Sequence, residues 1–387
     1  MSVKRAAIIG AGIAGLTAAL SLSRHGIACD VIEQAGQIGE VGAGLQVSPN
    51  ASRILAELGV LSDLESVWQE PDHIGLKSGL SLRPLASVPA GAYARKRWGA
   101  PYGVLHRATL QQALLQAVLR NPLCRLHTGH RIERAEPAII AAVTGATPDI
   151  IVGADGVWSK IRTQIPGGAE ARFSGNIAWR FLIPNKAAPS FIDSGNVTAF
   201  LGPASHLVCY PLKEAGSINI VAITSGANPG ETWSAGNNDG QRAILAQHFS
   251  SWNAEIRTLL RSAEKLTYWP LFEVSAGRWN NGRDTILIGD AAHAMMPFAA
   301  QGAAMAIEDA FELGGLLAGL PLPEALSAYD ARRMPRIAQL RKRGAFNKFA
   351  YHARGPLRIG RDFVLSLRPP QSLAADLDWI YGYRAAG

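Results

Sequence analysis

The sequence predicts an α/β protein with a parallel sheet, an antiparallel sheet inserted into it, and helices at the C-terminus. Two observations predict this fold class. Three short apolar strands each run into glycine or aspartate, near residues 10, 155 and 290. Between about 173 and 280, strand-like segments alternate with Gly, Pro and Asn turns. The length of 387 residues allows two or three domains.

The first strand begins a mononucleotide-binding unit. Residues 6–9 form an apolar strand, GAGIAG follows at 10–15, and a helix is expected to about residue 25. A second strand at 28–32 ends on Glu33. This is the GxGxxG pattern in the strand, turn, helix and strand context that gives it meaning, and it predicts a Rossmann-like fold.

Each glycine of that turn has a physical role. Gly10 permits the tight turn, Gly12 lets the backbone approach a pyrophosphate, and Gly15 lets the helix pack on the strand. The helix N-terminus offers free N–H groups to the phosphates. Glu33 lies where an acid accepts hydrogen bonds from ribose hydroxyls. The unit predicts an adenine dinucleotide, either NAD or FAD.

Two further strands end on acids, Asp155 and Asp290. Either acid alone could be a helix cap or a turn residue. In an α/β chain, however, the three strand ends converge at the carboxyl edge of one sheet, where ligands bind. A nicotinamide enzyme does not need these two acids, whereas the ribityl hydroxyls of a flavin do. The pattern therefore favours FAD.

These residues together resemble the FAD-dependent aromatic hydroxylases, the p-hydroxybenzoate hydroxylase-like flavoprotein monooxygenases, and most closely their salicylate and 3-hydroxybenzoate hydroxylase branch. The matching segments appear in family order and cover nearly the whole chain. They are GAGIAGL at 10–16, GAGLQVSPNASRIL at 42–55, LHRATLQQAL at 105–114, GADGVWSKIR at 153–162, AWR at 178–180, GDAAHAMMPFAAQGAAMAIEDA at 289–310 and DWIYGY at 378–383. The family's longer β-hairpin is abbreviated between 131 and 149.

The resemblance implies a p-hydroxybenzoate hydroxylase-like fold: a Rossmann-like FAD-binding domain, an inserted antiparallel β-sheet substrate domain, and C-terminal helices. It implies FAD as cofactor, with NADH or NADPH docking transiently as co-substrate. Glu33 would hold the adenosine ribose, Arg107 the pyrophosphate or ribityl region, and Asp290 the ribityl hydroxyls. The expected cofactor-binding residues are Gly10, Gly12, Ala14, Gly15, Glu33, Gln46, Arg107, Asp155, Gly289, Asp290, Pro297, Gly302 and Ala303.

The resemblance also places the segment from Pro297 to Ala303 beside the isoalloxazine ring. A helix starting near Gly302 would direct its N–H groups and positive dipole end toward the reduced flavin. Gln46 and Gln301 are candidate polar groups of the pocket. His293 is expected to be structural rather than a proton donor.

The chemistry implied is hydroxylation of a small hydroxybenzoate-like or salicylate-like aromatic by O₂ through a flavin C4a-hydroperoxide. The candidate catalytic residues are His206, Tyr210, Gln301 and Pro297. His206 and Tyr210 share one face of a regular strand, and His206, directly or through Tyr210, is the candidate base for the phenol. In the alternative interpretation, His206 is a turn residue and Tyr210 a half-buried sheet aromatic.

The expected FAD-binding domain comprises residues 1–71, 101–172 and 281–355, the substrate domain 72–100 and 173–280, and a C-terminal helical segment 356–387. The net charge of +8 is scattered, except for a basic run at 332–343 interpreted as a solvated helix face. Three separated cysteines predict neither a metal site nor a disulfide framework. We expect a cytoplasmic monomer or homodimer with no nucleic acid and no stable membrane insertion.

Other functions remain open at this point. The same chemistry could act on an N-heteroaromatic such as hydroxynicotinate, a quinone precursor or a polycyclic antibiotic. A nicotinamide-dependent dehydrogenase would use only residues 1–34 as its Rossmann site. A non-catalytic FAD-binding protein could use its basic C-terminal helix as a contact surface.

Overall fold

The structure is a computed structural model, and it describes residues 3–39, 44–228 and 239–387. The first two residues of the GAGLQ motif, Gly42 and Ala43, lie outside the described residues. So does the stretch 229–238 of the expected substrate domain.

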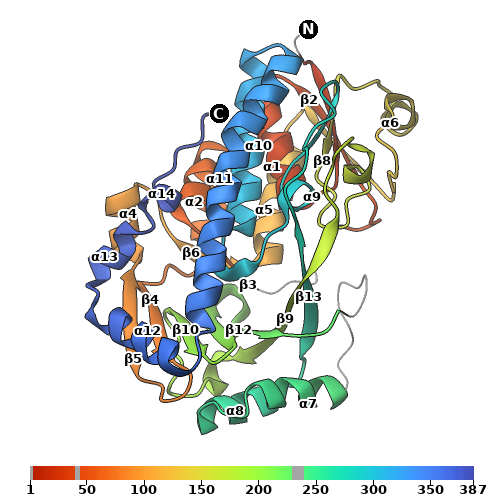
Figure 1. The fold of residues 1–387 in the computed structure, drawn as a ribbon. Helices are drawn as coiled ribbons and strands as arrows, with labels where there is room; N and C mark the ends of the chain where they lie inside the picture. Colours follow the sequence, from red (N-terminus) through yellow and green to blue (C-terminus); the bar gives the residue numbers. More distant parts are fainter. Residues whose placement is uncertain (1–2, 40–43, 229–238) are drawn as a thin grey trace.

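Five parallel strands form one sheet in the order β14-β8-β1-β2-β7. Two of them, β2 and β8, are labelled in Figure 1. Their bounds are β1 Arg5–Ile9, β2 Ala28–Glu33, β7 Cys124–Thr128, β8 Ile150–Gly153 and β14 Thr285–Leu287. β8 lies between β1 and β14, with Gly153 opposite both Ile9 and Leu287. The predicted convergence of the three strand ends at one sheet edge is therefore confirmed.

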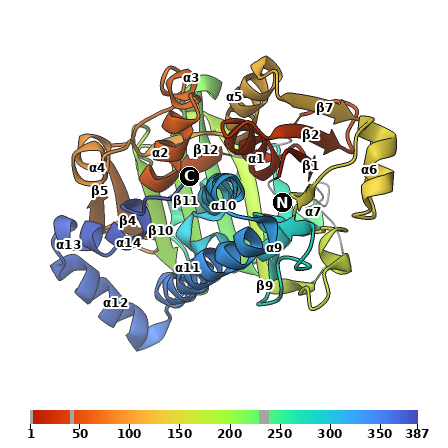
Figure 2. The same ribbon diagram turned by 90° about the horizontal axis from the view of Figure 1, so that it is seen from above.

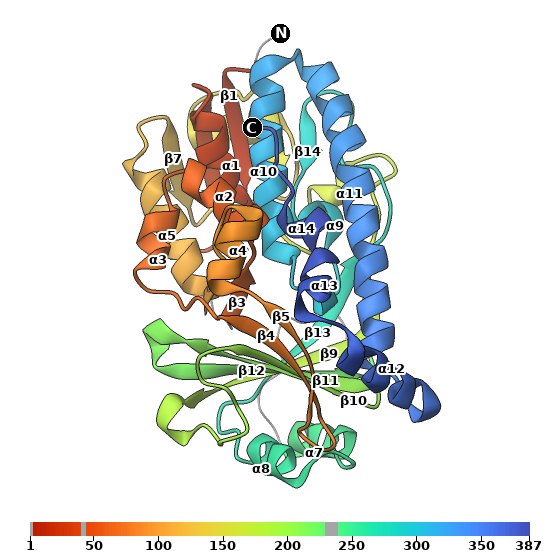
Figure 3. The same ribbon diagram turned by 90° about the vertical axis from the view of Figure 1, so that its left-hand side faces the viewer.

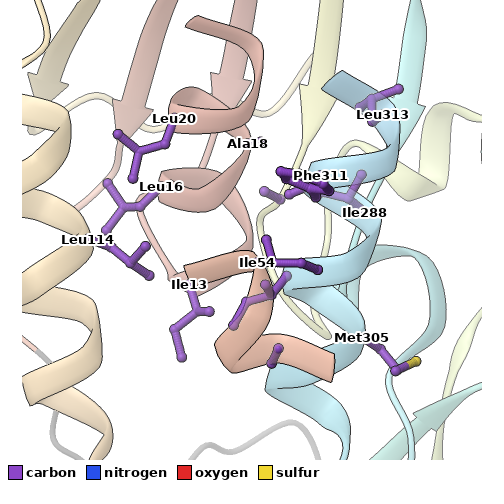
Figure 4. Packing of buried hydrophobic residues seen from close by; sticks show 14 of the residues in the cluster. Ile13, Leu16, Ala18, Leu20, Ile54, Leu114, Ile288, Met305, Phe311 and Leu313 are labelled. Carbon is purple, nitrogen blue, oxygen red and sulfur yellow. The ribbon is translucent and has the colours of Figure 1, made fainter. Parts of the chain in front are cut away.

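Helix α1 (Ile13–Ser23) packs against this sheet between α5 (Arg107–Arg120) and α10 (Gly302–Gly319). Figure 4 shows apolar side chains of these helices filling the space between them. Other elements of this part are α2 Pro49–Glu57, α3 Leu61–Glu65, α4 Gly91–Trp98, α6 Pro137–Thr144, α9 Asp290–His293, η1 Arg162–Gln164 and η4 Pro297–Ala299. Helix α6 occupies the segment where the family's hairpin is abbreviated.

The second sheet has seven strands in the order β13-β9-β12-β11-β10-β4-β5, antiparallel except for the pair β10 and β4. Their bounds are β4 His73–Ser78, β5 Pro84–Pro89, β9 Ala171–Pro184, β10 Val197–Gly202, β11 Ser205–Leu212, β12 Ser217–Ser225 and β13 Thr267–Val274. Two short strands, β3 Gly44–Val47 and β6 Gly103–His106, pair separately. The turns η2 Asn185–Ala187 and η3 Lys213–Ala215 flank the sheet strands.

The two faces of this sheet have different partners. One face packs on α7 (Asp239–His248) and α8 (Ala254–Arg261) through a cluster that includes Trp179, Phe200 and Leu207. Figure 3 shows these helices below the sheet and the parallel-sheet unit above it. Because successive side chains of a strand point to opposite faces, those that do not pack on α7 and α8 point toward the parallel-sheet unit. A ligand between the two sheets would contact this upper face.

The chain ends in α11 (Leu322–Tyr351), α12 (Gly355–Leu367), α13 (Pro370–Ala375) and α14 (Asp378–Tyr381). Helix α11 runs beside α10, and α12 lies at the edge of the molecule next to β5 (Figure 2). In the described ranges, no helix combines the length and the apolar character needed to cross a bilayer.

Candidate active site

The turn between β1 and α1 is closed by close backbone contacts. Gly10 has a positive φ of 106°, and a Cβ there would lie 2.5 Å from the Ala154 oxygen. A Cβ at Gly15 would lie 1.9 Å from the Gly10 oxygen. By contrast, a Cβ at Gly12 would meet no atom within 4 Å. Gly10 and Gly15 are thus required by the fold, and Gly12 leaves open space in front of the helix N-terminus.

Glu33 stabilises this turn from the end of β2. One carboxylate oxygen accepts a hydrogen bond from the Ala11 amide at 2.9 Å, and the other accepts one from the Ala35 amide at 2.9 Å. The side chain therefore lies directly beside the glycine turn.

Asp155, two residues after β8, is held by the backbone that follows it. Its Oδ2 accepts hydrogen bonds from the Lys160 and Ile161 amides at 2.8 and 3.2 Å. Its Oδ1 is buried and has no hydrogen-bond partner among the described residues. Burial raises the pKa of Asp155, although hydrogen bonds from Ser159 and the backbone oppose the shift. A buried acceptor without a donor calls for an explanation, which a ligand donor would provide.

Asp290 follows the third strand and has an exposed carboxylate that lines the central cavity. The preceding Gly289 has a positive φ of 59°, and a Cβ there would lie 3.0 Å from the Ala14 Cβ. This close approach brings the Gly289 turn against the start of α1. The two cofactor motifs, far apart in sequence, therefore share one edge of the sheet.

A cavity of about 940 Å³ extends from this edge to the upper face of the seven-stranded sheet. The predicted site residues that line it are Gly12, Ala14, Gln46, Arg107, His206, Tyr210, Asp290, Pro297, Gly302 and Ala303. The predicted site residues that lie beside it without lining it are Gly10, Gly15, Glu33, Asp155, Gly289 and Gln301. One continuous space thus connects the glycine turn with the His206 and Tyr210 strand.

The loop before α10 forms the wall between the two ends of the cavity. Pro297 begins the short helix η4, and Gly302 begins α10, where a Cβ would meet no atom within 4 Å. Gln301 points away from the cavity: it is buried and exchanges hydrogen bonds with Ser48 and Asn50. In this structure Gln301 fixes the loop, while the open helix end faces the cavity.

Gln46 of β3 and Arg107 of α5 both line the cavity. The Gln46 Oε1 accepts a hydrogen bond from the buried Tyr102 hydroxyl at 2.5 Å, which fixes the amide beside the cavity. Arg107 is the first residue of α5, directly after the N-cap His106. Gln46 precedes the first strand of the seven-stranded sheet, whereas Arg107 lies between its strands β5 and β9 in the chain.

His206 is buried at the far wall and pairs with a residue that the sequence reasoning did not identify. Its Nδ1 lies 2.9 Å from the Nε2 of His352, which follows α11. Its ring also contacts Phe298 and Tyr351, with centroids 5.2 and 5.3 Å apart. No sequence motif identified His352, because 146 residues separate the two histidines.

The pKa values of both histidines are low. Burial, and then His352, lower the pKa of His206 well below its ordinary value. Burial, with Lys348 and Arg354, lowers the pKa of His352 to about 4. Both rings are therefore neutral at pH 7, and the pKa of His206 lies below the near-neutral value expected from the sequence.

Tyr210 lines the same cavity as His206, and burial raises the pKa of its hydroxyl. The two residues are four positions apart on β11, which corresponds to roughly 13 Å along a strand. No hydrogen bond between them is found among the described residues, so a relay from His206 through Tyr210 has no direct contact to use. Arg180, which lies on strand β9 of the same sheet, also lines the cavity.

The basic run at 332–343 is not simply a solvated helix face, which corrects the interpretation from the sequence. Arg333 and Arg336 are buried against α10. Arg333 donates to Glu308 and Asp309, each at 2.7 Å, and Arg336 donates to Glu308 at 2.6 Å. Periodicity alone could not show that two of these cations face acids on a neighbouring helix.

Asp309 connects this ionic cluster to the cofactor edge. Its Oδ2 accepts a hydrogen bond from the Gly289 amide at 2.9 Å and lies 2.5 Å from the His293 ring nitrogen. Burial alone would raise the pKa of Asp309, but His293 and Arg333 lower it far below its usual range. His293 is buried in this cluster and does not line the cavity.

Comparisons with known proteins cover nearly the whole chain. A family model described as FAD binding domain matches residues 4–343. A 3-amino-4-hydroxybenzoate 2-monooxygenase of Streptomyces platensis is 36% identical over 390 residues, which is 99% of this chain and 96% of that protein. A 3-hydroxybenzoate 6-hydroxylase of Aquipseudomonas alcaligenes is 33% identical over 391 residues, or 97% and 96% of the two chains.

Among solved structures, Klebsiella pneumoniae HpxO complexed with FAD and uric acid aligns with a TM-score of 0.81 at 25% identity. The alignment covers 96% of this chain and 95% of that one. These matches confirm both the resemblance drawn from the sequence motifs and the predicted fold class.

Proposed function

Because the chain belongs to the FAD-binding domain family, we propose that it hydroxylates a small aromatic substrate of the hydroxybenzoate or salicylate class. It is an FAD-dependent monooxygenase that uses NADH or NADPH and O₂. The observation that carries the proposal is the single cavity that runs from the glycine turn to His206 and Tyr210. It joins a nucleotide site to a pocket in which apolar side chains lie beside His206, Tyr210 and several arginines, as expected for a flavin beside its aromatic substrate.

The described residues fit FAD. The open space at Gly12 suits a pyrophosphate at the N-terminus of α1, and Glu33 suits the adenosine ribose. Arg107 and Asp290 would hold the pyrophosphate and ribityl region, and the unpartnered Oδ1 of Asp155 offers a further acceptor. The fit comes from the donors and acceptors that the chain leaves available at one sheet edge.

The ring-side wall would hold the isoalloxazine between Gln46 and the segment from Pro297 to Ala303. When bound, FAD supplies the redox chemistry: it takes a hydride from NAD(P)H and activates O₂ for transfer to the aromatic ring. Helix α10 begins at Gly302 and directs its N–H groups toward this wall, which favours negative charge there. The apolar lining around it excludes water.

The substrate wall would orient the phenol and take its proton. We assign the Nε2 of His206 as the atom that accepts the phenol proton, because the Nδ1 of His206 is engaged with His352. Its low pKa disfavours holding the proton, so the proton passes from Nδ1 to His352, which is less deeply buried. Tyr210 would orient the aromatic ring from the other end of the strand.

The function is tested by oxidation of NADH and NADPH by the purified holoprotein, with oxygen uptake and peroxide measured in parallel. The ligands are salicylate, 3- and 4-hydroxybenzoate and 6-hydroxynicotinate. We expect a hydroxybenzoate to stimulate oxidation and to give a hydroxylated product with little peroxide. A protein that remains without flavin after FAD is added, or a yellow protein that none of these ligands stimulates, would contradict the proposal.

Two variants test the substrate wall. His206→Gln and Tyr210→Phe should each lower the hydroxylation rate by about 10²-fold or more. Tyr268→Phe is the matched control, because Tyr268 packs in the cluster on the opposite face of the same sheet. If both cavity variants hydroxylate as fast as the control, the assignment of His206 and Tyr210 is wrong.

The domain boundaries, the cellular location and the assembly state of the enzyme are also part of the proposal. We take residues 1–71, 101–172 and 281–355 as the FAD-binding domain, 72–100 and 173–280 as the substrate domain, and 356–387 as a C-terminal helical segment. The protein acts in the cytoplasm as a monomer or homodimer. Limited proteolysis tests the boundaries, and light scattering after size-exclusion chromatography tests the assembly state.

A further inference from the structure

The large apolar side chains that lie exposed are concentrated in one region, the end of α11 and helix α12. Of the eleven such side chains among the described residues, seven lie between 346 and 367, with exposed fractions of 55–65%. A concentration of this kind marks a contact surface, whereas an ordinary surface carries single, scattered apolar residues. The seven residues, here called the α12 patch, are Phe346, Phe349, Leu357, Ile359, Phe363, Val364 and Leu367.

Helix α12 directs most of its apolar side chains outward. None of its 13 residues is buried, and Figures 2 and 3 show the helix at the periphery of the molecule. Of its six large apolar side chains, Leu365 packs against buried residues and the other five belong to the α12 patch. A polar side chain ties the helix to the protein, because Arg361 donates hydrogen bonds to the carbonyl oxygens of Ala350 and Tyr351 at 2.9 and 3.2 Å. A surface helix normally turns its apolar face to the core, so the orientation of α12 indicates an apolar partner outside the chain.

The α12 patch borders the cavity of the proposed active site. Four of its residues are both exposed and part of the cavity lining, so the cavity reaches the protein surface at the patch: Phe346, Phe349, Leu357 and Val364. The other three do not line the cavity: Ile359, Phe363 and Leu367. These three side chains can therefore be replaced without changing the cavity wall.

The region around the patch is strongly basic. Between residues 341 and 376 the chain has eight Lys or Arg residues and two Asp residues, which gives a net charge of +6. The two acids pair with Arg361 and Arg368, whereas Arg354, directly before α12, is exposed. A second copy that docked here through a two-fold axis would meet the same positive charge. An anionic lipid surface would instead supply the opposite charge.

We propose that the α12 patch docks the protein on a membrane surface that contains anionic lipids. Helix α12 would lie in the plane of the interface, with Ile359, Phe363 and Leu367 at the boundary between headgroups and acyl chains. Such docking is peripheral and needs no helix that spans the bilayer. It would place the opening of the cavity at the lipid surface. The proposal goes beyond the proposed function and does not depend on which aromatic compound the enzyme hydroxylates.

The test is co-sedimentation of the purified holoenzyme with lipid vesicles over a range of lipid concentrations. One set of vesicles is phosphatidylcholine alone, and the other is phosphatidylcholine mixed with the anionic phosphatidylglycerol. The wild type should bind the anionic vesicles at least about 10-fold more tightly, because several cations lie near the patch. Raising the NaCl concentration should weaken this binding, because salt screens the attraction.

Matched variants separate the patch from the rest of the surface. The double variant Phe363→Ser, Leu367→Ser removes two exposed apolar side chains and should raise the apparent Kd for anionic vesicles by at least about 10-fold. Arg354→Gln removes one exposed cation and should raise it by about 5-fold. Leu119→Ser is the control: Leu119 is 55% exposed on α5, outside the patch, and its replacement should leave this Kd unchanged. All three variants should retain FAD.

Loss of vesicle binding by the double variant, with its FAD content and assembly state unchanged, would support the inference. The inference is overturned if the wild type binds neither kind of vesicle, or if the double variant binds anionic vesicles as tightly as Leu119→Ser does. Light scattering adds a further check. A dimeric wild type and a monomeric double variant, neither of which binds vesicles, would show that the patch joins two copies of the chain, and would also overturn the inference.

Discussion

The glycine turn offers a way to separate cofactor binding from folding with two substitutions three residues apart. Gly12→Ala and Gly15→Ala each add one methyl group to the same motif. At Gly12 the backbone is ordinary for any residue, with φ −75° and ψ −176°, and an added Cβ meets nothing within 4 Å. At Gly15 the added Cβ lies 1.9 Å from the Gly10 oxygen.

The structure sets the expected magnitudes. Alanine at Gly12 restricts the unfolded chain, which stabilises by about 0.4–1 kcal/mol, and loses the N-cap preference for glycine at a cost of roughly the same size. The free energy of unfolding of the apoprotein should therefore change by less than about 1 kcal/mol. The methyl group stands where the pyrophosphate approaches, and losing one charge-assisted hydrogen bond there should raise the Kd for FAD by about 10- to 100-fold.

Gly15→Ala should differ in its effect on the stability of the apoprotein. Real Cβ atoms do not approach other atoms closer than 3.0 Å, so α1 must move away from the turn by about 3.0 − 1.9 = 1.1 Å. Such overpacking costs about 1–3 kcal/mol and sometimes more. We therefore expect a less stable apoprotein as well as weaker FAD binding.

The assay is urea unfolding of both apoproteins, followed by titration of FAD fluorescence. The reasoning is refuted if Gly12→Ala binds FAD like the wild type, because the open space would then not be the cofactor path. It is also refuted if Gly12→Ala destabilises the apoprotein as much as Gly15→Ala does.

Three further predictions concern single side chains. Asp290→Ala should raise the Kd for FAD by about 10-fold without lowering apoprotein stability, because the carboxylate is exposed to the cavity; an unchanged Kd would remove Asp290 from the cofactor site. Asp309→Asn should lower the free energy of unfolding by about 3–5 kcal/mol in urea, whereas Glu133→Gln, in an exposed ion pair, should change it by less than about 1 kcal/mol; equal effects would contradict the role of the buried cluster. Because the pKa of His352 falls to about 4 on folding, stability should fall by up to about 3 kcal/mol as the pH drops from about 6.5 to 4. His352→Gln should flatten this part of the pH–stability curve, and an unchanged slope would show that His352 does not titrate in this way.

The positions of the candidate cofactor residues could be predicted from sequence because the determinants of these positions are local. The spacing of Gly10, Gly12 and Gly15 follows from contacts within one turn, and the acids lie directly after their strands. Parallel strands bring their carboxyl ends to the same edge of the sheet, whatever the structure of the segments that connect them. The structure places Asp155 and Asp290 after neighbouring strands for that reason.

The rest of the site depends on contacts between distant segments. Arg333 and Arg336 have a solvated-face pattern in sequence, yet Glu308 and Asp309 on α10 bury them. His352 belongs to no recognisable motif, and only the packing of α11 beside η4 brings it to His206. Periodicity within one helix carries no information about which acid or ring a neighbouring element supplies.

Burial, and then His352, keep the histidine of the cavity neutral. Five arginines and two aspartates line the described part of the cavity, so its lining has an excess of positive charge. Burial disfavours the charged ring of His206, and a proton held there would add a buried cation to that excess. The same excess would favour the phosphates of FAD and, in the proposed reaction, a phenolate. A site of this charge would promote loss of the phenol proton by stabilising the anion that remains, so that His206 and His352, in their proposed roles, would need only to pass the proton on.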